Sequence, residues 1–250
     1  MLIIQEPNLA WCYLPFDNGI SDVQGHAQVS QSGDLRIENQ FADFNSPADR
    51  LLITNAQILN QFTRGITISF GQSGKDSIHR ADTLVSSDFT YPDQAPELAI
   101  GLGLWERPEV LFWQCGQRQD PHSQLTGIHQ VSQQWSGRWN HWAFTKDFTT
   151  GVMCAYLNGK LLYNTQGQVT SLSHINTLTL GNGWYSHYDG LMDDFRIHDY
   201  ALNAQECAYL ATNGTGKLTL PAILPSDFNL DGNVDWQDFA LLASEWINSD

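Results

Sequence analysis

Apolar and polar residues alternate in short runs along most of this chain, from its beginning to about Arg196. A period of two residues places alternate side chains on opposite faces of a strand, so each run predicts a half-buried strand. The clearest runs are Gly65–Phe70, Pro108–Trp113, Asn140–Thr145, Val152–Leu157, Thr177–Leu180 and Leu191–Ile197. Turn signals such as Asn158-Gly159 and Asp189-Gly190 separate them. Many short strands without intervening helices predict an all-β fold, an antiparallel sandwich or jelly roll.

The pattern changes after the last of these runs. Residues Asn203–Leu210 have apolar positions at helical spacing, and Asn203 can cap the first turn, so we expect a helix that closes one end of the sandwich. Glycines and prolines interrupt both periods between Gly214 and Ser226, which predicts a linker. We therefore expect a β domain at residues 1–213, a linker at 214–226 and a C-terminal unit at 227–250.

The C-terminal unit opens with oxygen-bearing side chains at the spacing of an EF-hand calcium loop. They occupy loop positions 1, 3, 5, 9 and 12, with Gly232 at position 6, and are Asp227, Asn229, Asp231, Asp235 and Asp238. Asn233 at position 7 would add its backbone carbonyl. The apolar run Phe239–Ile247 repeats at helical spacing, so loop and helix together predict one calcium-binding unit. A solvated acidic turn that binds no ion is the alternative.

Charge and composition restrict the partners. The chain has 27 acidic and 12 basic residues, a net charge of -15, which repels phosphate backbones and anionic membranes. We therefore expect no nucleic acid partner, and no long apolar stretch predicts membrane insertion. Nine tryptophans and few charged residues are typical of an extracellular or cell-surface β protein. Met1–Glu6 is too short for a signal peptide, so we expect either that export is encoded upstream of a fragment or that the start was miscalled, and an intracellular protein is the alternative.

Four cysteines leave the redox state open. Cys12, Cys115, Cys154 and Cys207 show no short metal-ligand spacing, so structural zinc is not expected. Buried free thiols and disulfides fit the sequence equally well.

Three segments carry a family resemblance. They are Trp139–Phe144, Tyr156–Lys160 and Tyr188–Leu202, and they are preceded by Phe16-Asp17 and by Asp22 with Gly25-His26. Together they resemble the bacterial laminin-G-like family, a concanavalin A-like jelly roll, across nearly all of residues 9–212. The resemblance implies a sandwich of two antiparallel sheets. It also implies a second calcium ion, bound by Asp17, Asp22, the Gly25 carbonyl and one of Asp193 or Asp194. A carboxylate that pairs with Arg196 or caps a turn is the alternative.

The C-terminal unit resembles a bacterial type I dockerin repeat, with Asp238 where EF-hand sensors carry a glutamate. The resemblance implies that calcium is bound by Asp227, Asn229, Asp231, Asn233, Asp235 and Asp238, and that a cohesin-like protein is a partner. A complete dockerin has two repeats, and this sequence has one.

Ligand recognition needs exposed aromatic rings beside hydrogen-bonding groups. The glycine-bounded loop 183–188 fits best, and its candidates are Trp184, Tyr185, His187 and Tyr188. Residues 105–107 and 120–122 are weaker candidates. The alternative is that the loop rings pack over the sandwich edge. Trp113, Trp139 and Trp142 lie on predicted strands and are expected in the core, and His141 is expected to be a hydrogen-bonded structural residue.

No pair of catalytic carboxylates is recognisable in the sequence. The laminarinase-like members of this fold carry E-x-D-x-x-E on one strand, whereas Asp193 and Asp194 are adjacent and a strand would point them to opposite faces. We therefore expect a non-catalytic, extracellular or surface-associated module that binds a glycan or another surface polymer and docks through calcium at its C-terminus. The alternatives are a structural or assembly protein without sugar binding, and a polysaccharide-active enzyme with an unrecognised site.

Overall fold

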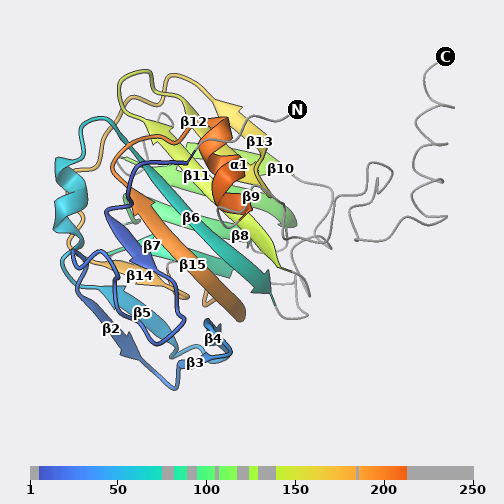
Figure 1. Cartoon of the computed structure of the whole chain (residues 1–250). Helices are drawn as coiled ribbons and strands as arrows, with labels where there is room; N and C mark the ends of the chain where they lie inside the picture. Colours follow the sequence, from blue (N-terminus) through green and yellow to red (C-terminus); the bar gives the residue numbers. More distant parts are fainter. Residues whose placement is uncertain are drawn as a thin grey trace, which may run out of the picture.

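The structure is a computed structural model that describes residues 6–74, 82–88, 95–104, 107–116, 124–128, 139–183 and 186–212. These residues form a sandwich of two antiparallel sheets (Figure 1). In spatial order, the first sheet contains β13 (Lys160–Thr165), β12 (Met153–Leu157), β11 (Asn140–Asp147), β6 (Gly65–Gly74), β15 (Gly190–His198), β4 (Phe41–Phe44) and β3 (Arg36–Glu38), with β1 (Cys12–Leu14) paired to β15. The second contains β10 (Gln124–Ile128), β9 (Arg107–Cys115), β8 (Leu98–Leu104), β7 (Asp82–Ser87), β14 (Leu178–Leu180), β5 (Arg50–Ile53) and β2 (Val29–Ser32). The predicted fold class, an all-β jelly-roll sandwich, is confirmed.

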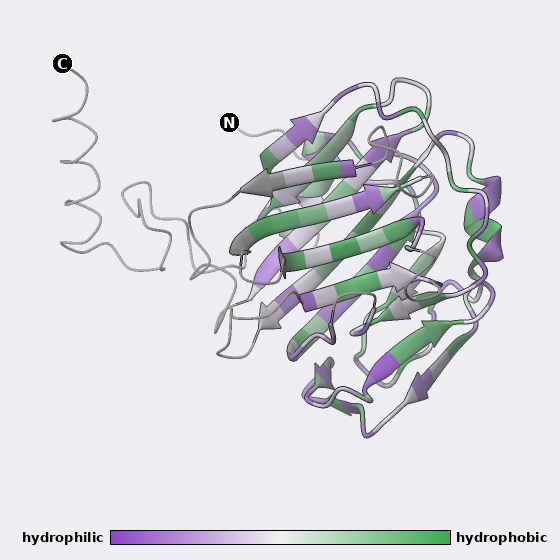
Figure 2. Cartoon of the chain, turned by 180° about the vertical axis from the view of Figure 1, so that it is seen from behind, coloured by the Kyte–Doolittle hydropathy of each residue, from purple (hydrophilic) through white to green (hydrophobic). Residues whose placement is uncertain are grey.

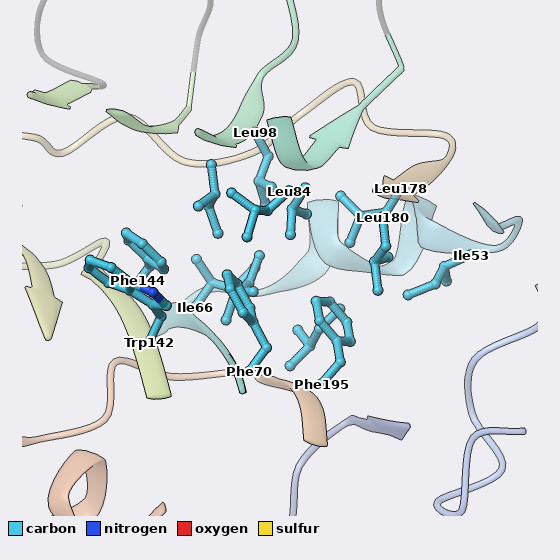
Figure 3. Close-up of a cluster of buried hydrophobic side chains, with 14 of the residues drawn as sticks. Ile53, Ile66, Phe70, Leu84, Leu98, Trp142, Phe144, Leu178, Leu180 and Phe195 are labelled. Carbon is cyan, nitrogen blue, oxygen red and sulfur yellow. The ribbon is translucent and has the colours of Figure 1, made fainter. Parts of the chain in front are cut away.

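The core lies between the two sheets. Polar and apolar residues alternate along many strands, as the sequence pattern predicts (Figure 2). Their apolar side chains meet in one layer, in which Phe70, Phe144 and Phe195 from the first sheet face Leu84, Leu98 and Leu178 from the second (Figure 3). Trp113 and Trp142 are fully buried, which confirms their prediction as core residues. Trp142 stacks on Phe144 with ring centroids 5.8 Å apart.

Helix α1 (Ala204–Ala211) begins where the sequence predicts. The Asn203 side chain accepts hydrogen bonds from the first turn, and the Glu206 side chain accepts one from the Asn203 amide, a complete capping box. The expectation that this helix closes an end of the sandwich is wrong, because it lies on the outer face of the first sheet (Figure 1). The apolar outer side chains of β11 and β12 explain this position, since Cys207 and Leu210 cluster there with Ala143, Cys154 and Tyr156.

The contact between α1 and the β12–β13 turn requires a glycine. Gly159 has a φ of +76°, and a Cβ placed on it would lie 2.9 Å from the Cα of Ala208. The turn Asn158-Gly159 therefore lets the helix approach the sheet closely and fixes the position of its C-terminal end. A 3-10 helix at Ala56–Gln61 precedes β6.

All four cysteines are buried and free, which decides between the two alternatives that the sequence left open. Burial raises the pKa of each thiol, in the case of Cys115 to about 12. Thiols of this kind are chemically inert at neutral pH. No helix in the described part of the chain is long and apolar enough to cross a membrane.

Candidate functional site

The outer face of the first sheet carries a row of three residues beside the C-terminal end of α1. Gly71 of β6 pairs in register with His141 of β11 on one side and with Asp193 of β15 on the other. Neighbouring strands lie about 4.8 Å apart, so the backbones of His141 and Asp193 are separated by about 10 Å. Because the central residue has no side chain, the floor between the outer two is open.

This floor belongs to a surface pocket of about 300 Å³, here called the outer-face pocket. Besides the row itself, its lining includes Asn39, Gln40, Phe41, Trp139, Asp194 and Ala211. A Cβ placed on Gly71 would lie 3.6 Å from the Asp193 Cβ and 3.7 Å from Cε3 of Trp139. These are ordinary contact distances, so the glycine keeps space free for a ligand and does not relieve a clash.

Phe41 and Trp139 form an aromatic wall of this pocket. Their ring centroids are 5.5 Å apart at an interplanar angle of 57°, and both side chains are half-buried. The prediction that Trp139 belongs to the core is therefore wrong. It precedes the first residue of β11, so its ring lies at the pocket instead of between the sheets.

The turn between β3 and β4 forms the rim. Asn39 and Gln40 have φ values of 52° and 71°, which is the conformation of a two-residue type I′ hairpin turn. Glycine or asparagine is preferred at such positions, and Gln40 is neither. Its amide is held at the pocket rim at a cost in backbone strain, and strained residues gather at binding sites.

His141 lines the pocket without a hydrogen-bond partner. Its side chain is only 6% exposed, and neither ring nitrogen bonds to any described residue. Burial, together with the positive charge of Arg196, lowers the pKa of the imidazole to about 3, so the ring is neutral. The expectation of a hydrogen-bonded structural histidine is not met among the described residues. An unpaired buried polar group costs about 1–3 kcal/mol, which a ligand can recover.

Asp193 and Asp194 differ strongly although they are adjacent. Asp194 has a φ of 52° at a β-bulge, and its carboxylate accepts a 2.9 Å hydrogen bond from Arg196 and a 2.6 Å bond from the Tyr13 hydroxyl. The ion pair that the sequence left as an alternative is therefore observed. Partial burial and the charges of Asp194 and Asp17 raise the pKa of Asp193 to about 7.

Two of the residues expected to hold a second calcium ion, Asp22 and Asp194, have other partners in this structure. The two carboxylate oxygens of Asp22 accept hydrogen bonds from four backbone amides, those of Tyr13, Gln24, His26 and Ala27. Asp194 is occupied by Arg196 and Tyr13. Among the described residues no group of three or more His, Cys, Asp or Glu side chains could hold a metal ion, and a second calcium ion at Asp17, Asp22, Gly25, Asp193 or Asp194 stays a prediction. Asp22 instead stabilises the loop after β1.

The expected ligand-binding loop is only partly described. Trp184 and Tyr185 lie outside the described residues, and His187 is half-buried and bridges to Asn182. Tyr188 is 1% exposed, packs 5.9 Å from the Phe44 ring and donates a hydrogen bond to the Leu191 carbonyl. The expectation of an exposed binding ring at Tyr188 is wrong, because the residue lies next to the start of β15 and its ring packs in the core between the sheets. Trp105, Glu106 and residues 120–122 also lie outside the described residues, and so does the predicted calcium unit from Asp227 onward.

A second pocket of about 340 Å³ lies beside the 3-10 helix, with Trp11, His26 and Asn55 in its lining. Here the polar groups are already used. His26 Nδ1 lies 2.8 Å from the Trp11 carbonyl oxygen, and the Asn55 amide donates to the His26 carbonyl and accepts from the Gln28 amide. This pocket is therefore a weaker candidate than the outer-face pocket.

The outer-face pocket was not predicted from the sequence. A glycine inside an alternating strand, Gly71, can signal close approach of another group. The other signals were too weak. Glutamine is not typical of a type I′ turn, so Gln40 did not indicate one, and a tryptophan at the beginning of a predicted strand is usually expected in the core.

Comparison with known proteins gives a family and a fold. The sequence model of the concanavalin A-like lectin/glucanases superfamily, Laminin_G_3, matches residues 55–208. No curated protein sequence matches the chain significantly.

Several solved structures share the fold. The receptor binding domain of botulinum neurotoxin C/D mosaic serotype superposes with a TM-score of 0.64 at 16% identity, over 82% of this chain and 51% of that chain. The binding domain of botulinum neurotoxin DC, solved in complex with rat synaptotagmin II, gives 0.65 at 18% identity and the same coverage. The same domain in complex with SialylT gives 0.64 at 18% identity, again with the same coverage. The chain thus spans about half the length of these structures.

Proposed function

Since the chain belongs to the concanavalin A-like lectin/glucanases superfamily, we propose that it is a non-catalytic binding module that holds a carbohydrate in the outer-face pocket. The observation that carries this proposal is the aromatic wall of Phe41 and Trp139 beside polar side chains. Sugar rings present apolar CH faces that stack on aromatic rings, while their hydroxyls need fixed polar partners. A volume of about 300 Å³ is at the small end for ligand pockets and suits one sugar unit of a longer glycan.

The solved structures of similar fold support binding over catalysis. These structures are binding domains, one of them in complex with SialylT. A further structure of similar fold is from botulinum neurotoxin type C, whose cell entry depends on interaction with two ganglioside molecules. At identities of 16–18%, this likeness supports the fold and adds only a precedent for glycan recognition.

The carboxylates of the pocket also favour a non-catalytic role. Glycoside hydrolysis needs two carboxyl groups on either side of the scissile bond, about 5–9.5 Å apart. The Oδ1 atom of Asp194 is held in its ion pair with Arg196 and its hydrogen bond with Tyr13, so Asp193 is the carboxylate that we assign to the ligand. Release of reducing ends from mixed polysaccharides by the purified chain would instead establish an enzyme.

Affinity electrophoresis of the full chain in gels containing soluble polysaccharides, followed by a glycan array, tests the proposal. Trp139→Ala and Phe41→Ala should each lower affinity about tenfold, the loss of about 1.4 kcal/mol of stacking and contact. Trp11→Ala is the matched control, since this half-buried tryptophan lines the other pocket. If Trp11→Ala loses retention in the polysaccharide gels and Trp139→Ala keeps it, the carbohydrate binds in the second pocket. No retention by any glycan would favour a structural or assembly protein.

We further propose that the C-terminal unit is a calcium-dependent docking element of an extracellular or cell-surface protein. The support is the sequence spacing of Asp227, Asn229, Asp231, Asn233, Asp235 and Asp238, whose oxygen donors match the preference of calcium. A cohesin-like protein is the expected partner, and pull-down with and without a chelator tests it.

A further inference from the structure

We propose that the row His141–Gly71–Asp193 is a subsite for an uncharged sugar unit, and that it rejects anionic glycans. The inference rests on the proposed carbohydrate-binding function and specifies its ligand. It starts from His141, whose two ring nitrogens lack partners among the described residues although the side chain lines the pocket.

A neutral imidazole has one N–H donor and one acceptor nitrogen. A carboxylate or sulfate only accepts, and an ammonium group only donates, so each could satisfy one nitrogen and not the other. A hydroxyl both donates and accepts, so it can pair with either ring nitrogen in either tautomer, and each nitrogen needs a hydroxyl of its own because the two point in nearly opposite directions. Both nitrogens are screened from water in the free protein. Binding therefore requires a rotation about the Cβ–Cγ bond, whose torsion is broad for histidine, that turns a ring nitrogen toward the pocket.

The charges around the pocket point the same way. Its described lining contains no lysine or arginine. Arg196, which lies close by, is taken up by the Asp194 carboxylate, and its guanidinium lies 4.0 Å over the Tyr13 ring. Anion sites in proteins use arginine, lysine or helix N-termini. Here the lining residue Ala211 belongs to the last turn of α1, where the helix carries negative partial charge.

Asp193 supplies the second polar contact across the open floor. Its side chain lines the pocket about 10 Å from His141 across the glycine, so a sugar ring seated over Gly71 has a hydrogen-bonding group on both sides. An anionic sugar at this position would face Asp193, Asp194 and, further out, Asp17, and no described basic side chain of the lining would compensate.

The test measures binding of the full chain by calorimetry to three groups of oligosaccharides. The neutral group contains cellotetraose, laminaritetraose, xylotetraose and mannotetraose. The anionic group contains 3′-sialyllactose, a heparin tetrasaccharide and tetragalacturonic acid, and the cationic probe is deacetylated chitotetraose. We expect binding in the neutral group alone. Strongest binding of an anionic or cationic probe would overturn the inference while leaving the proposed function intact, and binding of none would remove both.

Three variants test the row itself. Gly71→Val should lower the affinity for the neutral ligand at least about tenfold because its methyl groups fill the floor, whereas Gly71→Ala should change it by less than about threefold. His141→Phe keeps the ring and removes both nitrogens, so affinity should fall about tenfold while the melting temperature stays equal or rises. A purely structural histidine would give the opposite result, lower stability with unchanged affinity. Unchanged affinity in both Gly71→Val and His141→Phe would show that the sugar does not sit on this row.

Discussion

The Arg196 guanidinium lies between the Asp194 carboxylate, at 2.9 Å, and the face of the Tyr13 ring, at 4.0 Å. Asp194 and Arg196 belong to the same strand, β15, and their side chains are in contact at its β-bulge, where Asp194 has a left-handed conformation. The Tyr13 hydroxyl donates to the same carboxylate, so β1 is fastened to β15 by three side chains. This arrangement occupies Asp194 and leaves its neighbour Asp193 to the pocket.

Asp194→Asn should lower the free energy of unfolding by about 2 kcal/mol, because it removes the charge from hydrogen bonds in a largely buried ion pair. Chemical denaturation followed by tryptophan fluorescence measures the change. Asp193→Asn is the matched control and should not show this loss. Equal losses in both variants would mean that the Arg196 ion pair is not the reason.

The stability of the domain should depend on the ionisation of Asp193. Its pKa is raised from 3.8 to about 7 in the folded state, so the folded protein binds the proton more tightly than the unfolded chain. This group's favourable contribution is therefore fully present below about pH 4 and is lost as the pH rises to about 7. Asp193→Asn should raise the melting temperature at pH 8 and leave it nearly unchanged at pH 4. A gain of the same size at both pH values would contradict the shift.

Gln40→Gly should stabilise the β3–β4 hairpin by about 1 kcal/mol, because glycine adopts a positive φ without steric cost. The same change removes the amide from the pocket rim and should weaken glycan binding. Thermal unfolding and calorimetry on one protein sample measure both effects. Asn39→Gly is the comparison and should gain less stability, because asparagine already tolerates this conformation. Stability gained without loss of affinity would show that the Gln40 amide does not touch the ligand.

Tyr188→Ala should lower the free energy of unfolding by about 3–5 kcal/mol, the usual cost of deleting a buried aromatic ring. Tyr188→Phe removes only the hydroxyl with its hydrogen bonds, among them the one to the Leu191 carbonyl, and should cost about 1 kcal/mol. Urea titration separates the two variants. Retained stability together with lost glycan binding in Tyr188→Ala would restore this ring to the binding site.

Terbium can report on the C-terminal unit in the full chain, because Trp236 and Trp246 lie in or near the predicted calcium loop and can sensitise its luminescence. We expect a signal that calcium displaces and that Asp231→Ala abolishes, since removal of one ligand weakens such a site strongly. The melting of the sandwich should not change in this variant. A signal that survives Asp231→Ala would place the ion elsewhere.

The sequence predicts the sandwich well because its signals are local. Alternation in Gly65–Phe70 and Asn140–Thr145 marks which side chains face the core between the sheets, although both faces of these strands are buried. The capping box at Asn203 and Glu206 marks the start of α1. The position of α1 on the sheet was missed, since it depends on the outer side chains of two other strands.

The pocket was missed for a related physical reason. It exists only because register brings His141, Gly71 and Asp193 into one row from strands that are far apart in the chain. Register between distant strands is fixed by packing of the whole sheet and leaves no local pattern. The sequence instead favoured Tyr188, whose glycine-rich neighbourhood resembles an exposed loop although the ring is buried.

The four buried, unpaired thiols make the sandwich independent of the redox potential around it. With no described disulfide to form or break, its folding requires neither an oxidant nor an isomerase, and reductants such as glutathione have no covalent bond to attack. The same domain can therefore be obtained from a reducing bacterial cytoplasm and used under oxidising conditions. Its melting temperature should be identical with and without dithiothreitol.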